Sequence, residues 1–382
     1  MYTIPQYGKM INDASRMSAY ERALRQTIRP GSVVVDIGCG TGIFSLLACR
    51  MGAKRVYAIE PSDAIQVARE IARANSFADR IEFIQDLSSN ATLPERADVI
   101  VSDIHGLLPL FGKYIPTIVD ARTRLLKDTG VLIPQRESLW AGIVEAPEFY
   151  QRLVSPWDEG SFKLDMRAGR NRVVNSYVKT NTVPEQLLAA PMKWGDLHHM
   201  SMGDPNFAAT LRWSPGRSGI AHGIAVWFDA TLADGVEITN SPGSPPLIYA
   251  NTFLPLSEPV ALSGDEAITL ELRADLVGDD YIWRWNTRVA DGSSPSNFKA
   301  DFKQSTAFSE PLSLTRLRRR ASDHLPNLGS DGIVDAFILA QFDGATPLQT
   351  ISVRVRQKFP DEFQDAQDAL TRVANMSEQY GR

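Results

Sequence analysis

The strongest indication of the fold is VVVDIGCGTGIF at Val33–Phe44. Three β-branched residues lead into Asp36, and glycines follow at Gly38, Gly40 and Gly42 before an apolar helical pattern begins. Glycines at such a turn let the chain bend sharply and let a ligand lie against bare backbone. The pattern predicts a strand, a ligand-binding turn and a helix.

The spacing of this turn separates the ligand classes. A dinucleotide fingerprint needs a glycine where Ile43 stands, and a P-loop needs a following Lys-Ser/Thr pair that the stretch lacks. The acid before the first glycine, Asp36, suits a cationic ligand bearing an amino acid better than it suits a pyrophosphate. The turn therefore favours S-adenosylmethionine over NAD or ATP.

Polar residues end the next two apolar runs as well. Glu60 follows Asp36 by 24 residues, one helix and one strand later, where a carboxylate can accept both ribose hydroxyls. Asp86 and Ser88 end the third run, where the adenine edge is expected. The predicted cofactor site from these runs comprises Asp36, Gly38, Cys39, Gly40, Gly42, Glu60, Pro61, Asp86, Leu87 and Ser88.

The pattern of apolar and polar residues changes along the chain. Residues 1–30 have the pattern of a polar helical arm, and residues 31–137 alternate β-branched runs with helical stretches. That alternation predicts an α/β, Rossmann-like domain with a parallel sheet. Residues 138–315 have alternating strands split by Gly, Pro and Asp turns, which predicts an antiparallel β-barrel for the acceptor. Residues 325–382 predict a small C-terminal helical domain of three helices.

Composition excludes several classes of protein. The net charge of −5 argues against a general nucleic-acid binder, although Arg316 and Arg318–Arg320 form a basic run that is either solvated or meets an acidic partner. The two cysteines, Cys39 and Cys49, form no CxxC or Cys/His cluster, so no metal site is predicted. Without a signal peptide or a long apolar run, the expected location is cytoplasmic, away from membranes.

These motifs resemble those of the class I methyltransferases and, within them, the protein arginine methyltransferases, over roughly residues 5–310. DIGCGTG, AIEPS and SDIHG stand where the family has its successive motifs, which adds Ser102 to the expected cofactor site. MINDASRMSAY resembles the family's lid helix, which implies that Arg16 pairs with the methionyl carboxylate. HGIAVWFD and PPLIYANTFLPL resemble its barrel, and PWDEGSFKLDM begins where its dimerisation arm does, which implies an arm over about 157–192 and a homodimer.

The acceptor site departs from the family pattern. Two glutamates and a Thr-His-Trp loop surround the guanidinium in the family. The first acid corresponds to Asp103 and the second to Gly112, while the Thr-His-Trp loop corresponds to Ile248, Tyr249 and Ala250. Removing one carboxylate from a buried ion pair costs several kcal/mol. These differences favour an acceptor other than arginine.

His105 offers a replacement for the missing acid. It follows Asp103 by two residues on the loop after the fourth strand, and a near-neutral imidazole can deprotonate a nitrogen, hydroxyl or carboxylic acid nucleophile. The predicted catalytic residues are Asp103, His105 and Tyr249. The alternative is that His105 only packs against its loop. We expect His222 in the barrel and His198–His199 at the surface.

Three functions remain open. The leading hypothesis is an S-adenosylmethionine-dependent N- or O-methyltransferase that acts on a peptide or small-molecule acceptor, in natural-product biosynthesis, and releases S-adenosyl-L-homocysteine. The first alternative is an arginine N-methyltransferase acting on protein or free arginine. The second is a non-catalytic cofactor-binding scaffold. The C-terminal helices around an FDG turn resemble winged-helix elements that hold leader peptides; otherwise they are an appendage on the barrel or at the dimer interface.

Overall fold

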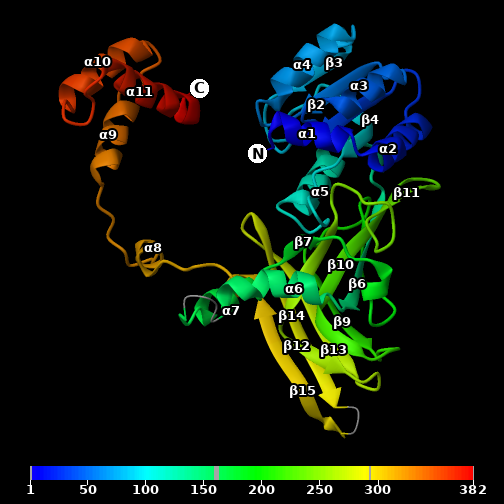
Figure 1. Cartoon of the computed structure of the whole chain (residues 1–382). Coiled ribbons are helices and arrows are strands. Elements are labelled where there is room, and N and C mark those ends of the chain that lie inside the picture. The colour runs from blue at the N-terminus through cyan, green and yellow to red at the C-terminus, as the bar shows by residue number, and fades with distance from the viewer. Residues whose placement is uncertain (1, 159–162, 292–293, 382) are drawn as a thin grey trace. The chain divides into compact units, whose positions relative to one another are not determined.

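The protein divides into two compact units. A computed structural model describes residues 2–158, 163–291 and 294–381, and it separates Met1–Pro311 from Leu312–Arg382. The first unit contains a parallel sheet and two antiparallel sheets, and the second contains helices (Figure 1). The α/β fold class predicted from the sequence is confirmed.

The parallel sheet is built from the short β-branched runs. Its five strands have the order β3-β2-β1-β4-β5. They are β1 (Val33–Ile37), β2 (Arg55–Ile59), β3 (Ile81–Ile84), β4 (Ala97–Ser102) and β5 (Leu126–Ile133), all parallel to their neighbours. All five residues of β1 are buried, as expected for a central strand covered on both faces.

Helices cover this sheet and precede it. They are α1 (Ile4–Ile11), α2 (Ala14–Thr27), α3 (Ile43–Arg50), α4 (Ala64–Ala74), the short η1 (Ala78–Arg80) and α5 (Tyr114–Arg124). Asp13 caps α2 by accepting a hydrogen bond from Arg16 N at 3.1 Å, so the start of this helix is set by a local side chain. Ala19, Tyr20, Ala23 and Leu24 bury one face of α2 in the core.

Two antiparallel sheets form the β domain. One has the order β7-β12-β10-β6-β8, with β11 paired to β10, and the other has the order β15-β14-β13-β9. The strands are β6 (Arg136–Val144), β7 (Val178–Thr180), β8 (Met192–His198), β9 (Phe207–Trp213), β10 (Gly219–Ala233), β11 (Val236–Thr239), β12 (Asn251–Leu262), β13 (Ile268–Val277), β14 (Asp280–Asp291) and β15 (Ser294–Ser305). Trp285 Nε1 donates to Pro255 O at 3.0 Å, so side chains help to join the two sheets.

The expected arm is partly helical. It follows α6 (Pro147–Val154) and includes η2 (Ser155–Trp157), α7 (Arg167–Val173) and η3 (Pro184–Gln186), while η4 (Thr306–Phe308) follows the last strand. Tyr150 OH donates to the carbonyl oxygens of Leu256 and Ser257 at 3.0 Å each, which fixes α6 on β12. Residues 159–162 of the expected arm lie outside the described residues.

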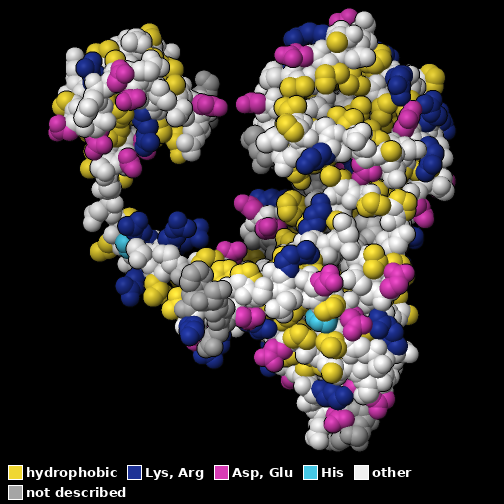
Figure 2. All heavy atoms as spheres, viewed as in Figure 1, with side chains coloured by type: hydrophobic (Ala, Val, Ile, Leu, Met, Phe, Trp, Pro, Cys, Tyr) yellow, Lys and Arg dark blue, Asp and Glu magenta, His cyan; other side chains and the backbone are white. Residues whose placement is uncertain are grey.

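The second unit has a core of its own. It consists of α8 (Leu314–Arg319), α9 (Ser330–Leu339), α10 (Leu348–Lys358) and α11 (Ala366–Tyr380). Val334, Ile351 and Val373 bring the last three helices together, and Arg372 pairs with Asp335 through two contacts of 2.8 and 2.9 Å. The basic run on and after α8 is exposed (Figure 2). No helix in the described part of the chain is long and apolar enough to cross a membrane.

Candidate active site

A cavity opens at the carboxyl ends of β1, β2 and β4, where the order of the parallel sheet reverses direction. Ligands of open α/β sheets bind at such a point. The cavity has a volume of about 1180 Å3 and is lined by the turns after these strands, by α1 and α2, and by the turn around Tyr249. In the described residues no group of His, Cys, Asp and Glu side chains is arranged to hold a metal ion.

The glycine turn after β1 requires glycine. Gly38, Gly40 and Gly42 have φ angles of +72°, +53° and +84°. A Cβ at Gly40 would lie 2.4 Å from the ring of Tyr7 on α1, and one at Gly38 would lie 2.3 Å from Ile104 Cγ2. The turn is therefore tightly enclosed by the first helix and by the loop after β4.

Glu60 lies at the end of β2 with its carboxylate toward the cavity. Oε2 accepts from Gly40 N at 3.1 Å, and Oε1 accepts from Ser62 N at 2.9 Å. These backbone donors fix the orientation of the carboxylate, and Glu60 lines the cavity beside Pro61. This placement suits a carboxylate that accepts ribose hydroxyl groups.

Asp36 is buried behind the turn. Its Oδ2 accepts from Ser45 Oγ at 2.6 Å and from Ser45 N at 2.9 Å. Its Oδ1 has no hydrogen-bond partner in the described part of the chain. Burial raises the pKa of Asp36 to about 7, despite the two hydrogen bonds that favour the ionised form. A cationic ligand near Oδ1 would stabilise the carboxylate.

Most of the predicted site residues line this one cavity. They are Arg16, Gly38, Cys39, Glu60, Pro61, Asp86, Leu87, Ser88, Asp103 and Tyr249. The others lie near it without lining it: Asp36, Gly40, Gly42, Ser102 and His105. Ser102 is buried, and its carbonyl oxygen accepts from Tyr20 OH at 3.5 Å.

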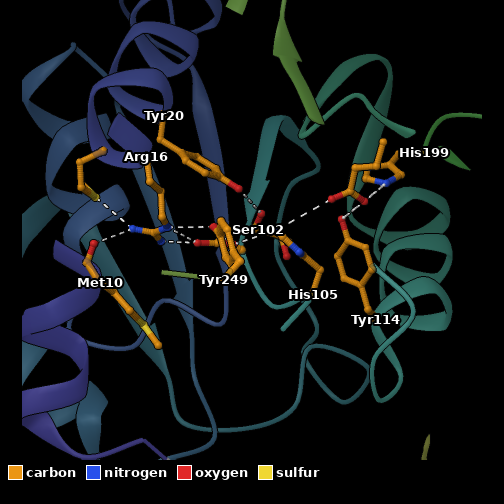
Figure 3. A network of polar contacts seen from close by, with 11 residues as sticks. Met10, Arg16, Tyr20, Ser102, His105, Tyr114, His199 and Tyr249 are labelled. Carbon is orange, nitrogen blue, oxygen red and sulfur yellow. Dashed lines mark hydrogen bonds and ion pairs between the residues drawn. The ribbon is translucent and has the colours of Figure 1, made fainter. Parts of the chain in front are cut away.

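Arg16, Asp103 and Tyr249 form one buried cluster (Figure 3). Arg16 Nε donates to Asp103 Oδ2 at 2.6 Å and lies 2.9 Å from Tyr249 OH, and Arg16 Nη2 also contacts Oδ2. Tyr249 OH donates to Asp103 Oδ1 at 2.7 Å. The guanidinium carbon lies 5.4 Å from the ring centre of Tyr20 and 5.3 Å from that of Phe44. Asp103 and Tyr249 thus hold a guanidinium in this structure.

Electrostatics keep this cluster ionised. Burial disfavours the charged form of Asp103, but Arg16 and then His105 outweigh it and hold the pKa of Asp103 well below its ordinary value. Burial opposes the charge of Arg16 as well, and Asp103 outweighs it, so the pKa of Arg16 is raised. Burial raises the pKa of Tyr249 well above its ordinary value, so its hydroxyl keeps the proton that it donates.

The turn that carries Tyr249 is fixed by distant residues. Ile248 N donates to Asp13 Oδ2 at 2.7 Å, and Ile248 O accepts from Lys179 Nζ at 2.5 Å. Ala250 has a φ angle of +54°, which an L residue rarely adopts, and its carbonyl oxygen accepts from Asn240 Nδ2. The contacts hold Tyr249 at the cavity.

His105 lies behind Asp103, away from the cavity. It is fully buried among Tyr249, Phe228 and Tyr114, with ring centres 4.8, 4.8 and 5.7 Å away. Its Nε2 lies 3.1 Å from Asp103 Oδ1 but is not aligned for a hydrogen bond. Because the imidazole is enclosed on this side, it has no access to an acceptor in this structure.

The sequence analysis did not predict that Glu137 and its hydrogen-bond partners lie beside the active site. Glu137 is fully buried on β6; its Oε2 accepts from Tyr114 OH at 3.1 Å and lies 3.0 Å from His199 Nε2. One sequence signal points to it: Glu137 shares the face of Leu139 and Ala141, which are apolar and buried. An acid in such a register is expected to be buried and paired.

One histidine expectation is wrong and another is confirmed. His199 is fully buried, because its Nδ1 lies 2.7 Å from Pro134 O and its Nε2 faces Glu137, whereas we expected it at the surface with His198. His198 is exposed. His222 lies in β10 as expected and is buried, with Nδ1 2.8 Å from Ile220 O.

The position of the missing acid has a structural role of its own. Gly112 has a φ angle of +49°, and its N–H donates to Asp280 Oδ1 at 3.2 Å. Lys113 Nζ pairs with Asp279 at 2.5 Å and lines the cavity, whereas Gly112 does not. The loop after β4 is therefore anchored to the turn between β13 and β14.

The cavity fits the cofactor class expected from sequence. Asp36 has an unpaired buried oxygen, the glycine turn leaves no room for a Cβ, and Glu60 offers a carboxylate at the end of β2. Asp86 and Ser88 line the part of the cavity next to β3, where the adenine edge was expected. Arg16, Asp36, Glu60 and Ser88 are the residues that would hold S-adenosylmethionine.

Comparison with known proteins also indicates a methyltransferase. Residues 18–138 match the family model of ribosomal protein L11 methyltransferase (PrmA). The chain is 30% identical over 277 residues to protein arginine N-methyltransferase 6 of Xenopus tropicalis, covering 69% of this chain and 81% of the relative. It is 25% identical over 308 residues to a probable protein arginine N-methyltransferase 6 of Arabidopsis thaliana, covering 69% and 71%.

Solved structures share the fold. Protein arginine methyltransferase 10 of Arabidopsis thaliana superposes with a TM-score of 0.69 at 20% identity, over 79% of this chain and 97% of the other. A Trypanosoma brucei PRMT1 enzyme–prozyme heterotetrameric complex with AdoHcy gives a TM-score of 0.71 at 21% identity, over 78% and 96%. The extent of the sequence match to the Xenopus enzyme and the geometry of the cavity lead to one conclusion: the chain belongs to the protein arginine N-methyltransferase family of S-adenosylmethionine-dependent methyltransferases.

Proposed function

We propose that this methyltransferase acts on the guanidinium of arginine, in a peptide or protein or as the free amino acid. The observation that supports this most directly is that Asp103 and Tyr249 hold the guanidinium of Arg16. A site that accepts one guanidinium has the charge and hydrogen-bonding groups to accept another. This reverses the preference drawn from the sequence, where arginine was the alternative.

Asp103 binds the guanidinium of Arg16 first and the guanidinium of the acceptor afterwards. Arg16 lines the cavity and is the residue expected to pair with the methionyl carboxylate of the cofactor. When Arg16 turns toward that carboxylate, Asp103 Oδ2 becomes free for an arriving guanidinium. Asp103 Oδ2 then binds the acceptor guanidinium alone, without a second carboxylate. An acid at the position of Gly112 is therefore not required for methylation of arginine.

The cofactor supplies an electrophilic methyl group on its sulfonium. A guanidinium nitrogen that forms the new C–N bond must lose one proton, because the methylated product is again a monocation. Asp103 Oδ2 is the oxygen that faces the guanidinium, and it can accept this proton once Arg16 no longer lowers the pKa of Asp103. Tyr249 keeps the other oxygen, Oδ1, in place.

A second candidate function has its own observation. The acceptor end of the cavity carries Lys113 and Lys179 and, at Gly112, no acid. Lys113 is paired with Asp279, but Lys179 adds positive charge to the lining, which favours a neutral or anionic nucleophile, such as a hydroxyl, carboxylic acid or neutral amine on a peptide or small molecule. Such an N- or O-methyltransferase would suit natural-product biosynthesis.

The experiment that separates the two presents both kinds of acceptor to the purified enzyme with S-adenosylmethionine. Arginine-containing peptides, free arginine, and matched peptides with lysine, serine or glutamate in place of arginine are compared by mass spectrometry. We expect a gain of about 14 Da, one methyl group, located on arginine. Methylation of a hydroxyl or carboxyl peptide, with none on arginine, would favour the second candidate instead.

We also propose a homodimer in the cytoplasm. Leu164 and Met166, apolar residues of the expected arm, are 59% and 37% exposed, so a partner chain could cover them. The double variant Leu164→Glu, Met166→Glu should shift the mass measured by light scattering from dimer to monomer. Leu325→Glu, at a residue 86% exposed in the other unit, is the matched control and should leave the dimer intact. A monomeric unmodified enzyme would contradict the proposal.

A further inference from the structure

The two oxygens of Asp103 have different surroundings. Oδ2 is contacted by Arg16 through Nε and Nη2. Oδ1 accepts from Tyr249 OH at 2.7 Å and lies 3.1 Å from His105 Nε2. Oδ2 is thus the oxygen available for exchange between guanidinium groups, while Oδ1 is bound to the interior of the protein.

His105 lies between two buried carboxylates. Its Nε2 is 3.1 Å from Asp103 Oδ1 and 3.9 Å from Glu137 Oε1. A nitrogen lone pair facing two carboxylates would be repelled by both, so Nε2 carries a hydrogen. Glu137 Oε1 has no hydrogen-bond partner in the described part of the chain, which leaves this oxygen to the histidine.

The charges of the surrounding elements favour an imidazolium. From α2 comes Arg16, from β6 comes Glu137, and the loop after β4 supplies Asp103; Tyr114 of α5 and the turn residue Tyr249 are neutral phenols, and β10 contributes only an aromatic ring. His199, beyond Glu137, faces the opposite oxygen, Oε2. Arg16 pairs with Asp103, and the second carboxylate, Glu137, has its Oε1 3.9 Å from His105 Nε2, where it stabilises a proton on His105.

We propose that His105 is an imidazolium that, supported by Glu137, fixes Asp103 for the acceptor guanidinium, so that His105 and Glu137 are positioning residues and not acid–base catalysts. This inference rests on the proposed arginine acceptor. It replaces the general base expected from sequence, because the ring is enclosed behind Asp103 and does not line the cavity. Figure 3 shows His105 between Tyr249 on one side and Tyr114 with His199 on the other.

The positive charge of His105 has its largest effect on Asp103 when Arg16 no longer contacts Asp103. In this structure Arg16 neutralises Asp103, but cofactor binding draws Arg16 toward a carboxylate of the ligand. Asp103 would then be a buried acid without a cation until the acceptor arrives, and buried acids without a partner take up a proton. The imidazolium keeps Asp103 ionised during that interval. Burial disfavours a charged His105, but Glu137 and then Asp103 outweigh it and raise its pKa.

A pH profile tests the role of the charge. For the unmodified enzyme with an arginine peptide, kcat/KM should fall as the pH rises through the raised pKa of His105; a general base would give the opposite slope. His105→Gln keeps a donor near the position of Nε2 without the charge. It should raise the peptide KM about tenfold to hundredfold, change kcat less, and remove the alkaline fall.

Glu137→Gln is the second variant. It removes the carboxylate that favours the imidazolium, so the alkaline fall should move to lower pH by about one unit or more. His222→Gln is the matched control, since His222 is also buried but contacts backbone groups of β10 and Ala146. Its profile should be that of the unmodified enzyme. A profile that is unchanged in both His105→Gln and Glu137→Gln overturns the proposal.

An acceptor-free measurement keeps the two proposals separate. Nitrogen-15 NMR of the full chain with bound S-adenosylhomocysteine reports the protonation of each imidazole, and comparison with His105→Gln and His199→Gln assigns the signals. We expect His105 to be doubly protonated at pH 7.5. A neutral His105 under these conditions would overturn the inference even if arginine is the acceptor. Absence of arginine methylation with a charged His105 would overturn only the proposed function.

Discussion

At the cofactor end of the cavity, backbone groups make many of the polar contacts: Gly40 N and Ser62 N donate to Glu60, and Ser45 N donates to Asp36. At the acceptor end, side chains from separate elements surround Asp103, with Arg16 from α2 and Tyr249 from the turn before β12. The first end is assembled from residues close in the chain, whereas Arg16 and Tyr249 are 233 positions apart.

This difference predicts how each end responds to mutation. A substitution at the cofactor end removes one contact, and the neighbouring backbone still holds its shape. A substitution at the acceptor end leaves a buried charge without its partner, which costs more than the contact itself. Four variants examine this contrast.

Asp103→Asn should have the largest effect. It leaves the Arg16 guanidinium buried without its carboxylate and removes the acceptor clamp, so methylation measured as kcat/KM should fall about 10²–10⁴-fold. Cofactor affinity, measured by calorimetry, should change by much less. Asp98→Asn, on β4 just before Asp103 in the chain and paired with Lys127 and Val33 N, is the control and should keep its activity. Activity of Asp103→Asn within tenfold of the unmodified enzyme would show that Asp103 does not hold the acceptor.

Asp36→Asn should separate stability from binding. The pKa of Asp36 is raised from 3.8 to about 7, so the stability it contributes is complete below about pH 4 and is lost as the pH rises through 7. An asparagine cannot ionise, so the ligand-free variant should be about 2–4 kcal/mol more stable than the unmodified protein at pH 8 in denaturant unfolding. That advantage should shrink toward pH 5, and cofactor binding should weaken. A variant less stable at pH 8 would contradict the burial argument.

Glu60→Ala tests the cofactor end directly. Loss of the carboxylate that faces the ribose should weaken cofactor binding by about 1.5–3 kcal/mol in calorimetry. The peptide KM at saturating cofactor should stay near that of the unmodified enzyme, because the acceptor end does not use Glu60. Glu95→Ala removes a surface carboxylate that pairs with Lys54 at 3.2 Å and should change neither quantity. Unchanged cofactor affinity in Glu60→Ala would remove Glu60 from the site.

Ala250→Gly should have the smallest effect, on the turn that positions Tyr249. Glycine relieves the φ angle of +54°, so thermal unfolding should show a gain of about 0.5–1 kcal/mol. The control is Ala261→Gly, at an exposed position of β12 without such strain, where a loss of about 0.5–1 kcal/mol is expected. A loss in both variants would indicate that the turn is not strained.

The sequence was sufficient for the α/β fold and for the cofactor class. The glycine turn after β1, the acid Asp36 and the acid Glu60 are local signals, because a strand followed by a tight turn leaves them at one edge of the sheet in any protein that forms it. The resemblance identified the family for the same reason, since its motifs lie at the ends of consecutive strands.

The surroundings of His105, Glu137 and His199 became known only from the folded chain. The sequence showed that His105 is close to Asp103, but it did not show on which side of the loop the imidazole ring lies. It also led us to expect His199 at the surface. Both rings are buried because β6, β10 and α5 bring Glu137, Phe228 and Tyr114 around them. Burial and charge pairing depend on residues far apart in the chain, so no local pattern determines them.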